Sequence, residues 1–287
     1  MFCKEGMEMK NDLYKRVLTV QDISCVGQCS LTVALPILSA CGLECAVLPS
    51  AVLSTHTGGF TGFTFRDLTD DMPAITAHWK KEGIAFDAVY TGYLGSAKQI
   101  EYVKAIFASV LKEGGKKIVD PAMADNGKLY SIFDMAFVEE MKKLTSEADV
   151  VLPNITEACL LTGTEYREKY GEAYVADLIA KLHAAGAETV VLTGVSYDDE
   201  TTGVAVYENG VLKYYRHEKM AKGCHGTGDV FASAFAGMYT RGMSAYDASV
   251  VAADYTLHCI KYTSGDESHW YGVKFEPLLS DLTDKIK

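Results

Sequence analysis

The segment best suited to chemistry is KGCHGTGDVFASAFAG, residues 222–237, where three glycines and a threonine surround one carboxylate. Gly226 and Gly228 allow a sharp turn, and the small apolar residues that follow predict a helix over about 227–241. Exposed N–H groups at the start of a helix, together with its dipole, form an anion hole. An anion hole that carries Asp229 instead of a lysine suits phosphoryl transfer, because the carboxylate can accept the proton of an attacking alcohol.

A structural alternative stays open for the same residues, since Gly-Thr-Gly-Asp is also a helix N-cap that stabilises a protein by about 0.5–2 kcal/mol. The chain has no GxxxxGK[ST] motif and no GxGxxG after its first predicted strand, which argues against P-loop and dinucleotide-binding folds. The helix dipole is expected to lower the pKa of Asp229. The scheme therefore works best if the alcohol proton leaves late, in a loose transition state.

Two further segments supply carboxylates in a pattern suited to magnesium. DPAMAD places Asp120 and Asp125 five residues apart, and PNITE places Asn154 and Glu157 at a predicted helix start. Magnesium prefers one or two carboxylates together with waters and phosphate oxygens, so this set predicts an ion held mainly through water. The alternatives are a turn residue for Asp125, which precedes an Asn-Gly pair, and an N-terminal helix charge for Glu157.

The scaffold that must position these residues is predicted to be an α/β fold with a mostly parallel sheet and helices on both faces. Six β-rich runs are continuously apolar, which is typical of strands covered on both faces. They span residues 16–22, 45–50, 87–92, 116–121, 149–153 and 189–194. Residues 203–218 predict an antiparallel edge hairpin with a type I′ turn at Asn209-Gly210, and a helix over about 245–263 follows the helix that begins at the anion hole.

Ligands of open α/β sheets bind beyond the carboxyl ends of the strands. The residues near those predicted ends are mostly polar or glycine, which suits a site: Asp22, Ser50, Gly92, Tyr93, Asp120, Asn154, Thr193 and Gly194. With no linker and no internal repeat, residues 16–287 are expected to form one domain. Residues 1–15 are interpreted as an N-terminal tail whose order the sequence leaves open.

Composition favours a small partner. The 287 residues are 48% hydrophobic and 23% charged with a formal net charge of −11, which disfavours nucleic-acid and anionic membrane surfaces. No apolar run is long enough for a membrane span or a secretion signal, so we expect a cytoplasmic protein. The eight cysteines fit reduced core thiols. Two CxxxC pairs, Cys25 with Cys29 and Cys41 with Cys45, lack the CxxC spacing that zinc sites more often use.

The GTGD string resembles the signature of the ribokinase-like superfamily, and five other segments resemble its pyridoxal, pyridoxine and pyridoxamine kinase branch. They are VLTVQD at the first strand, LSTHTGGFTGF (53–63), TGYLGSAKQ (91–99), DPAMADNGKLY (120–130) and LPNITEACLLTG (152–163). The resemblance covers about residues 16–265. It implies a ribokinase-like fold with a twisted sheet, ATP as co-substrate, Mg²⁺, often a K⁺ ion near the anion hole, and a homodimer.

The resemblance also implies a role for each matching residue. Asp229 is the catalytic base, and the anion hole is formed by Gly226, Thr227 and Gly228. The nucleotide site is predicted at Asn154, Glu157, Thr193 and Gly194, and the metal site at Asp120, Asp125 and Glu157. The substrate pocket maps onto Asp22, Thr57 and Tyr93, with Ser50, His56 and Phe60 nearby.

Within this pocket Tyr93 offers an aromatic face to a ring and Thr57 a hydroxyl, while His56 has the alternative of a loop histidine with purely local partners. Asp22 departs from the family, which usually has serine there to hydrogen-bond the substrate's ring. A carboxylate favours a protonated ring nitrogen or an amine, so the preferred substrate is left open. Cys224 could add reversibly to a bound aldehyde, but a bystander thiol is favoured.

We therefore expect ATP-dependent phosphorylation of the 5′-hydroxymethyl group of a vitamin B6 vitamer. The alternative among enzymes is a related kinase for hydroxymethylpyrimidine, a nucleoside or a sugar. The alternative of another class is a non-catalytic vitamer-binding protein, or a carrier that holds pyridoxal phosphate through Lys222. A non-catalytic protein would be favoured by loss of Asp229 or a glycine of the hole, and the sequence retains them all.

Overall fold

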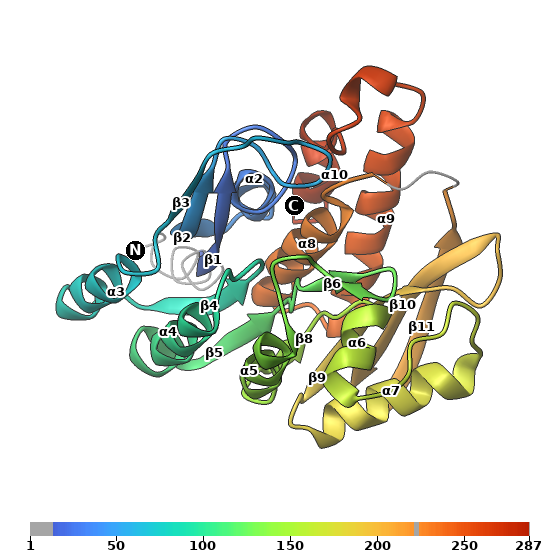
Figure 1. The fold of residues 1–287 in the computed structure, drawn as a ribbon, viewed down its shortest axis with the longest axis horizontal. Coiled ribbons are helices and arrows are strands. Elements are labelled where there is room, and N and C mark those ends of the chain that lie inside the picture. Colours follow the sequence, from blue (N-terminus) through green and yellow to red (C-terminus); the bar gives the residue numbers. More distant parts are fainter. Residues whose placement is uncertain (1–13, 221–223, 287) are drawn as a thin grey trace, which may run out of the picture.

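The computed structural model describes residues 14–220 and 224–286, so most of the proposed N-terminal tail and Lys222 lie outside the described residues (Figure 1). A nine-stranded sheet has the order β11-β10-β9-β8-β5-β4-β1-β2-β3. Its strands are β1 (Arg16–Ser24), β2 (Glu44–Leu53), β3 (Phe65–Asp67), β4 (Phe86–Thr91), β5 (Leu111–Val119), β8 (Val150–Val151), β9 (Thr189–Val195), β10 (Thr201–Glu208) and β11 (Val211–Glu218). A separate two-stranded sheet pairs β6 (Ala124–Asp125) with β7 (Lys128–Leu129).

The predicted mostly parallel sheet is confirmed. The pairs from β2 through β1, β4, β5 and β8 to β9 are parallel, whereas β3, β10 and β11 join antiparallel at the two edges. The edge hairpin turns at Asn209 and Gly210, whose φ angles of 53° and 80° are those of the expected type I′ turn. The run 149–153 pairs over only two residues, since Pro153 has no N–H to continue the ladder.

Helices cover both faces of the sheet (Figure 1). One face carries α3 (Met72–Lys81), α4 (Ala97–Ser109), α5 (Met135–Thr145), α6 (Ile155–Thr162) and α7 (Glu172–Ala184). The other carries α2 (Leu31–Ala40), α8 (Thr227–Arg241), α9 (Ala245–Thr263) and α10 (Leu279–Asp284), with two 3₁₀ turns at Glu267–His269 and Glu276–Leu278. The bounds of α8 and α9 are those expected from the sequence.

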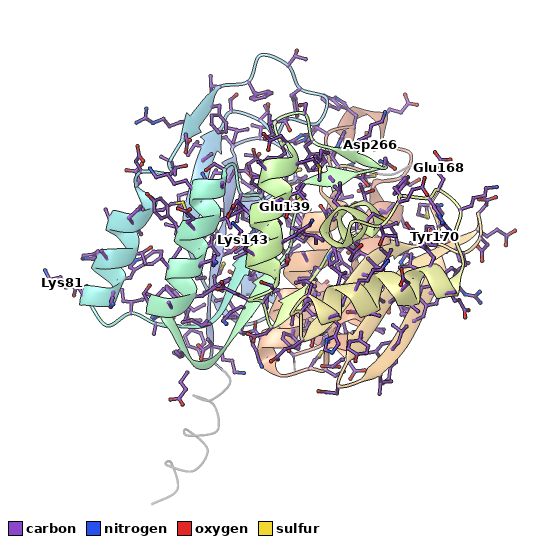
Figure 2. All side chains as sticks on the ribbon, turned by 60° about the horizontal axis from the view of Figure 1, so that its bottom comes forward. Lys81, Glu139, Lys143, Glu168, Tyr170 and Asp266 are labelled. Carbon is purple, nitrogen blue, oxygen red and sulfur yellow. The ribbon has the colours of Figure 1, made fainter. Side chains whose placement is uncertain are left out.

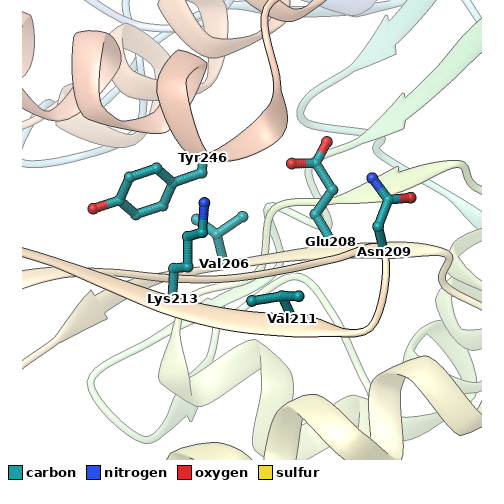
Figure 3. A pocket seen from close by; sticks show the side chains of 6 residues that line it. All are labelled: Val206, Glu208, Asn209, Val211, Lys213 and Tyr246. Atoms are coloured by element: carbon teal, nitrogen blue, oxygen red, sulfur yellow. The ribbon is translucent and has the colours of Figure 1, made fainter.

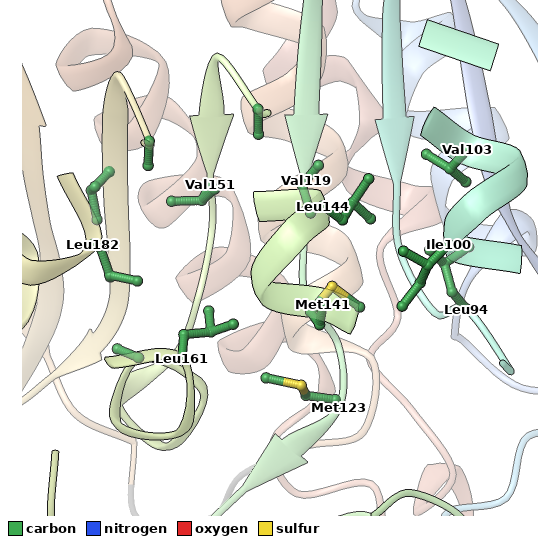
Figure 4. Packing of buried hydrophobic residues seen from close by; sticks show 14 of the residues in the cluster. Leu94, Ile100, Val103, Val119, Met123, Met141, Leu144, Val151, Leu161 and Leu182 are labelled. Carbon is green, nitrogen blue, oxygen red and sulfur yellow. The ribbon is translucent and has the colours of Figure 1, made fainter. Parts of the chain in front are cut away.

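Each face of the sheet has its own hydrophobic core. On the first face, Val103 of α4 and Leu144 of α5 pack in one cluster with Val119 of β5 and Val151 of β8 (Figure 4). Charged side chains lie on the outer side of these helices, as Glu139 and Lys143 of α5 do (Figure 2). Within the described ranges, no helix combines the length and the apolar character that a membrane crossing requires.

Gly203 of β10 is required by a close approach between two strands of the edge hairpin. A Cβ at this position would lie 1.9 Å from the carbonyl oxygen of Tyr215 on β11. We expect Gly203→Ala to lower the free energy of unfolding by about 2–3 kcal/mol, because the strands must separate to admit the methyl group. Urea unfolding measures the effect. Gly171→Ala, where a Cβ meets no atom within 4 Å, is the matched control and should change stability by less than about 1 kcal/mol.

Candidate active site

The anion-hole turn has the backbone geometry that its glycines predict. Gly226 precedes α8 in a left-handed conformation with φ of 78°, and a Cβ there would lie 1.7 Å from the carbonyl oxygen of Gln28. The chain therefore passes directly against the loop before α2. The hydroxyl of Thr227 donates to the carbonyl oxygen of Cys224 at 3.3 Å. Gly228 is exposed, and a Cβ on it would meet no atom within 4 Å, so its surface is open to a ligand.

Asp229 lies in the first turn of α8 and is only partly exposed. The pKa of its carboxyl is raised to about 7, because burial and the nearby charge of Asp22 outweigh hydrogen bonds from the Ser30 N–H and the Cys29 thiol. The expectation that the helix dipole lowers this pKa is therefore wrong, since desolvation is the larger effect at this position. A carboxyl group that exchanges its proton near neutrality is well matched to general base catalysis.

A second carboxylate, Asp120, lies near Asp229, and a third, Glu157, lies near Asp120. Asp120, which follows β5, has its pKa raised well above the ordinary range by burial and by the negative charges of Glu157 and Asp229. Glu157 is buried, and burial raises its pKa although three backbone N–H groups donate to it. Burial is the largest cause of the raised pKa of the Tyr130 phenol. Nearby negative charges raise it further, in decreasing order those of Glu157, Asp125, Asp120 and Asp229.

Glu157 also has a structural role. Its Oε2 accepts the Asn154 N–H at 2.9 Å and Asn154 Oδ1 accepts the Glu157 N–H at 3.0 Å, which is a capping box at the start of α6. Its Oε1 accepts the N–H groups of Met123 and Ala124 at 2.9 and 3.4 Å. The side chain therefore ties the turn after β5 to α6.

The predicted magnesium residues fit a cation held through water better than direct ligation. Asp125 is exposed, and its carboxylate accepts both the N–H and the side-chain amide of Asn126 at 2.8 and 2.9 Å, as the turn alternative expects. Among the described residues, no three His, Cys, Asp or Glu side chains are arranged to hold one ion. The mutual repulsion of Asp120 and Glu157 nevertheless suits a nearby cation. The magnesium site stays a prediction in this form.

The predicted nucleotide residues come together where β8 and β9 end. Asn154 and Thr193 form an isolated parallel bridge, and Thr193 N–H donates to the carbonyl oxygen of Pro153 at 2.9 Å. The Asn154 side-chain amide also donates to the carbonyl oxygen of Ala124 at 2.8 Å. Gly194 is exposed with φ of 68°, and its carbonyl oxygen accepts the hydroxyl of Tyr170 at 3.3 Å. Contacts of these residues with a nucleotide remain a prediction.

On the predicted substrate side, Asp22 is 5% exposed at the end of β1 and lies near Tyr93. Its Oδ1 accepts the hydroxyl of Ser30 at 2.5 Å and its Oδ2 that of Ser24 at 2.9 Å. Burial raises the pKa of Asp22 despite these two donors. Burial and the charge of Asp22 raise the pKa of Tyr93 to about 12. The buried Ser50 donates a long hydrogen bond, 3.5 Å, to the carbonyl oxygen of Tyr93.

His56 has local partners at both ring nitrogens. Nδ1 accepts the Gly58 N–H at 3.0 Å, so Nε2 carries the proton that it donates to the carbonyl oxygen of Tyr271 at 2.6 Å. The ring centroid lies 5.0 Å from that of Phe60 and 5.3 Å from that of His225, and burial lowers the His56 pKa. These contacts favour the loop-histidine alternative. The neighbouring Thr57 is exposed.

Sequence reasoning missed Ser24, Cys29, Ser30 and Tyr130. Ser24 is two residues after Asp22 on β1, so strand alternation places both side chains on one face and could have indicated it. Cys29 and Ser30 lie near Asp22 and Asp229 because the chain returns to β1 through a bridge between Ile23 and Ser30. No local pattern predicts that return.

A cavity of about 180 Å³ lies between the edge hairpin and α9, and Figure 3 shows the side chains that line it. It is lined by Val206, Glu208, Asn209, Val211, Lys213 and Tyr246. Because β10 runs antiparallel to β9, the hairpin turn lies beyond the amino end of β9, opposite the strand ends that carry Asn154 and Thr193. This cavity is therefore separate from the candidate active site.

Comparisons with known proteins identify the family of the chain. The phosphomethylpyrimidine kinase family matches residues 38–272. The hydroxymethylpyrimidine/phosphomethylpyrimidine kinase of Bacillus subtilis (strain 168) is 27% identical over 223 residues, which cover 75% of this chain and 78% of that protein.

Two solved structures are similar over nearly the whole chain. The pyridoxal kinase of Lactobacillus plantarum is 31% identical with a TM-score of 0.87, covering 94% of this chain and 97% of its own. A Bacteroides thetaiotaomicron protein, provisionally named a phosphomethylpyrimidine kinase and solved with pyridoxal, is 37% identical with a TM-score of 0.88, covering 94% and 96%. The chain thus belongs to the phosphomethylpyrimidine kinase family and is a ribokinase-like phosphotransferase of the pyridoxal kinase type, with an alcohol group as acceptor.

Proposed function

We propose that the protein transfers the γ-phosphoryl group of ATP to the 5′-hydroxymethyl group of a vitamin B6 vitamer. The observation that carries the proposal is the position of Asp229, which has a pKa near neutrality, in the first turn of α8 beside the open surface of Gly228 and close to the charge of Asp22, which in turn lies near Tyr93. The Lactobacillus pyridoxal kinase and the Bacteroides protein solved with pyridoxal support a B6 vitamer as the acceptor.

In the proposed reaction the oxygen of the hydroxymethyl group forms a bond to the γ-phosphorus of ATP while Asp229 accepts the proton of that hydroxyl. The bond between that phosphorus and the bridging oxygen breaks, and ADP leaves with the electron pair. N–H groups at Gly226, Thr227 and Gly228 stabilise the charge on the phosphoryl oxygens. Mg²⁺ held through water by Asp120, Asp125 and Glu157 would neutralise phosphate charge when bound.

The ring of the vitamer would lie against the aromatic face of Tyr93, with Asp22 facing its nitrogen. A charged Asp22 favours the protonated form of a pyridine nitrogen. A carboxylate also suits the ring nitrogen and amino group of an aminopyrimidine, and the family match supports hydroxymethylpyrimidine as the second candidate acceptor. By family resemblance we further propose K⁺ near the anion hole and a cytoplasmic homodimer.

The test is a coupled ADP-release assay with Mg-ATP and, separately, pyridoxal, pyridoxine, pyridoxamine and hydroxymethylpyrimidine. We expect turnover with at least one B6 vitamer at a kcat/KM at least tenfold above that for hydroxymethylpyrimidine, and loss of nearly all turnover in Asp229→Ala. A reversed order would assign the pyrimidine as acceptor. No turnover on any of the four would contradict the proposal, and a visible absorbance that borohydride removes from the purified protein would indicate the pyridoxal phosphate carrier.

A further inference from the structure

Ser30 has a backbone conformation that side-chain-bearing residues rarely adopt. Its φ and ψ are 57° and −134°, immediately before α2. Glycine adopts positive φ freely, whereas a residue with a Cβ is strained there by about 1–3 kcal/mol. Helix capping does not explain the serine, because its side chain makes no capping hydrogen bond to α2. Its carbonyl oxygen alone begins the helix, accepting the N–H groups of Val33 and Ala34 at 3.0 and 2.9 Å.

The side chain of Ser30 is directed instead to Asp22, in the predicted substrate site. Ser30 is 6% exposed, and its hydroxyl donates to Asp22 Oδ1 at 2.5 Å. Ser24 donates to the other oxygen of the same carboxylate at 2.9 Å. A carboxylate with one donor on each oxygen is fixed in orientation, and both donors stabilise its charged form. Ser30 is therefore half of the hydrogen-bonded frame that holds Asp22.

The backbone of Ser30 contacts the second carboxylate of the site. Its N–H, together with the thiol of Cys29, lies close enough to Asp229 on α8 to favour the charged form of that carboxyl and lower its pKa. The bridge between Ile23 and Ser30 holds this residue against β1, the strand that carries Asp22. One residue thus contacts a carboxylate on a strand through its hydroxyl and a carboxylate on a helix through its amide. Glycine would relieve the strain but could supply only the second contact.

We propose that Ser30 is a positioning residue that sets the orientation of Asp22, which faces the vitamer ring, relative to Asp229, which takes the proton of the alcohol. The inference rests on the proposed function. It also explains the strain: a hydroxyl is kept at a glycine-type backbone position because the substrate-facing carboxylate requires its second donor.

The test compares Ser30→Gly with Ser30→Ala. Both variants remove the hydroxyl, but only Ser30→Gly also relieves the backbone strain at positive φ. We expect the Tm of Ser30→Gly to exceed that of Ser30→Ala by several degrees. In both variants we expect the KM for the vitamer to rise about tenfold while the KM for ATP stays within twofold, because only the vitamer contacts Asp22. Ser24→Ala, at an unstrained position, should raise the KM for the vitamer without changing kcat more than about threefold.

A purely structural role for Ser30 predicts a different result. Ser30→Gly would then match or exceed the wild-type protein in kcat and in the KM for the vitamer, and this outcome would overturn the inference. Pyridoxal binding measured by calorimetry without ATP separates the two proposals. If the wild-type protein binds pyridoxal but turns over no acceptor, only the proposed function fails, and equal affinities of the wild type and Ser30→Gly overturn the role of Ser30. Absence of pyridoxal binding by the wild type overturns both.

Discussion

Replacing Asp229 by asparagine is expected to abolish nearly all turnover and, above pH 7, to make the protein more stable. Loss of a general base costs about 10²–10⁴-fold in kcat. The stability gain follows from the pKa of this carboxyl, which is raised from 3.8 to about 7 in the folded protein. Asparagine keeps the shape of the side chain but has no charge to bury.

The sign of the pH dependence is set by which state holds the proton. Between about pH 4 and pH 7 the folded protein keeps the proton on Asp229 while the unfolded chain has released it. Because the folded state binds the proton more tightly, the free energy of unfolding falls as the pH rises through this range. Above pH 7 the folded protein bears the whole cost of burying the charged carboxylate. The gap in pKa corresponds to at most about 4 kcal/mol, which partial exposure of the carboxylate reduces to roughly 1–3 kcal/mol.

Urea unfolding at pH 5 and pH 8 measures this effect, and ADP release measures turnover. The gain in stability of Asp229→Asn should be larger at pH 8 than at pH 5, and kcat/KM of the wild type should rise through about pH 7 as the base loses its proton. The exposed Glu113→Gln is the control and should alter neither. An active Asp229→Asn would remove Asp229 from the base role, whereas an equal stability change at both pH values would contradict the raised pKa.

Alanine at the two glycines of the anion hole is expected to separate folding from phosphate binding. In Gly226→Ala the new Cβ would lie 1.7 Å from the carbonyl oxygen of Gln28 at a backbone φ of 78°. Strain and steric overlap together should lower the free energy of unfolding by about 3 kcal/mol or more. The turn before α8 must move away from the loop before α2, so activity is lost together with stability.

Gly228→Ala is expected to impair ATP binding without lowering stability. A Cβ there meets no atom within 4 Å, and alanine is a better helix former than glycine by about 1 kcal/mol, so stability should be unchanged or higher. The methyl group would nevertheless occupy the space in which we expect a phosphoryl group. The KM for ATP should therefore rise at least tenfold, measured beside the Tm of both variants. A wild-type KM for ATP in a stable Gly228→Ala protein would place the phosphate elsewhere.

Much of the scaffold could be predicted from local patterns. Continuous apolar runs indicated the buried parallel strands, Asn209-Gly210 indicated the edge turn, and the bounds of α8 and α9 followed from their glycines and periodicity. These features are set by steric and burial preferences that act within a few residues. The short edge strand β3 and the β6–β7 pair were not predicted, because three or fewer residues carry no periodicity.

In the candidate site, too, some features follow from the local sequence and others only from the tertiary structure. The sequence by itself determined which residues stand near the carboxyl ends of the strands, and the family to which their motifs belong. Only the tertiary structure decided the protonation and the hydrogen-bond partners of these residues. Asp229 has a raised pKa where its helix position predicted a lowered one, and His56 uses both ring nitrogens for backbone contacts. It also brought Ser30 between Asp22 and Asp229. The physical reason is that desolvation and hydrogen-bond partners depend on chain segments distant in sequence, whereas strand, turn and helix preferences depend on near neighbours.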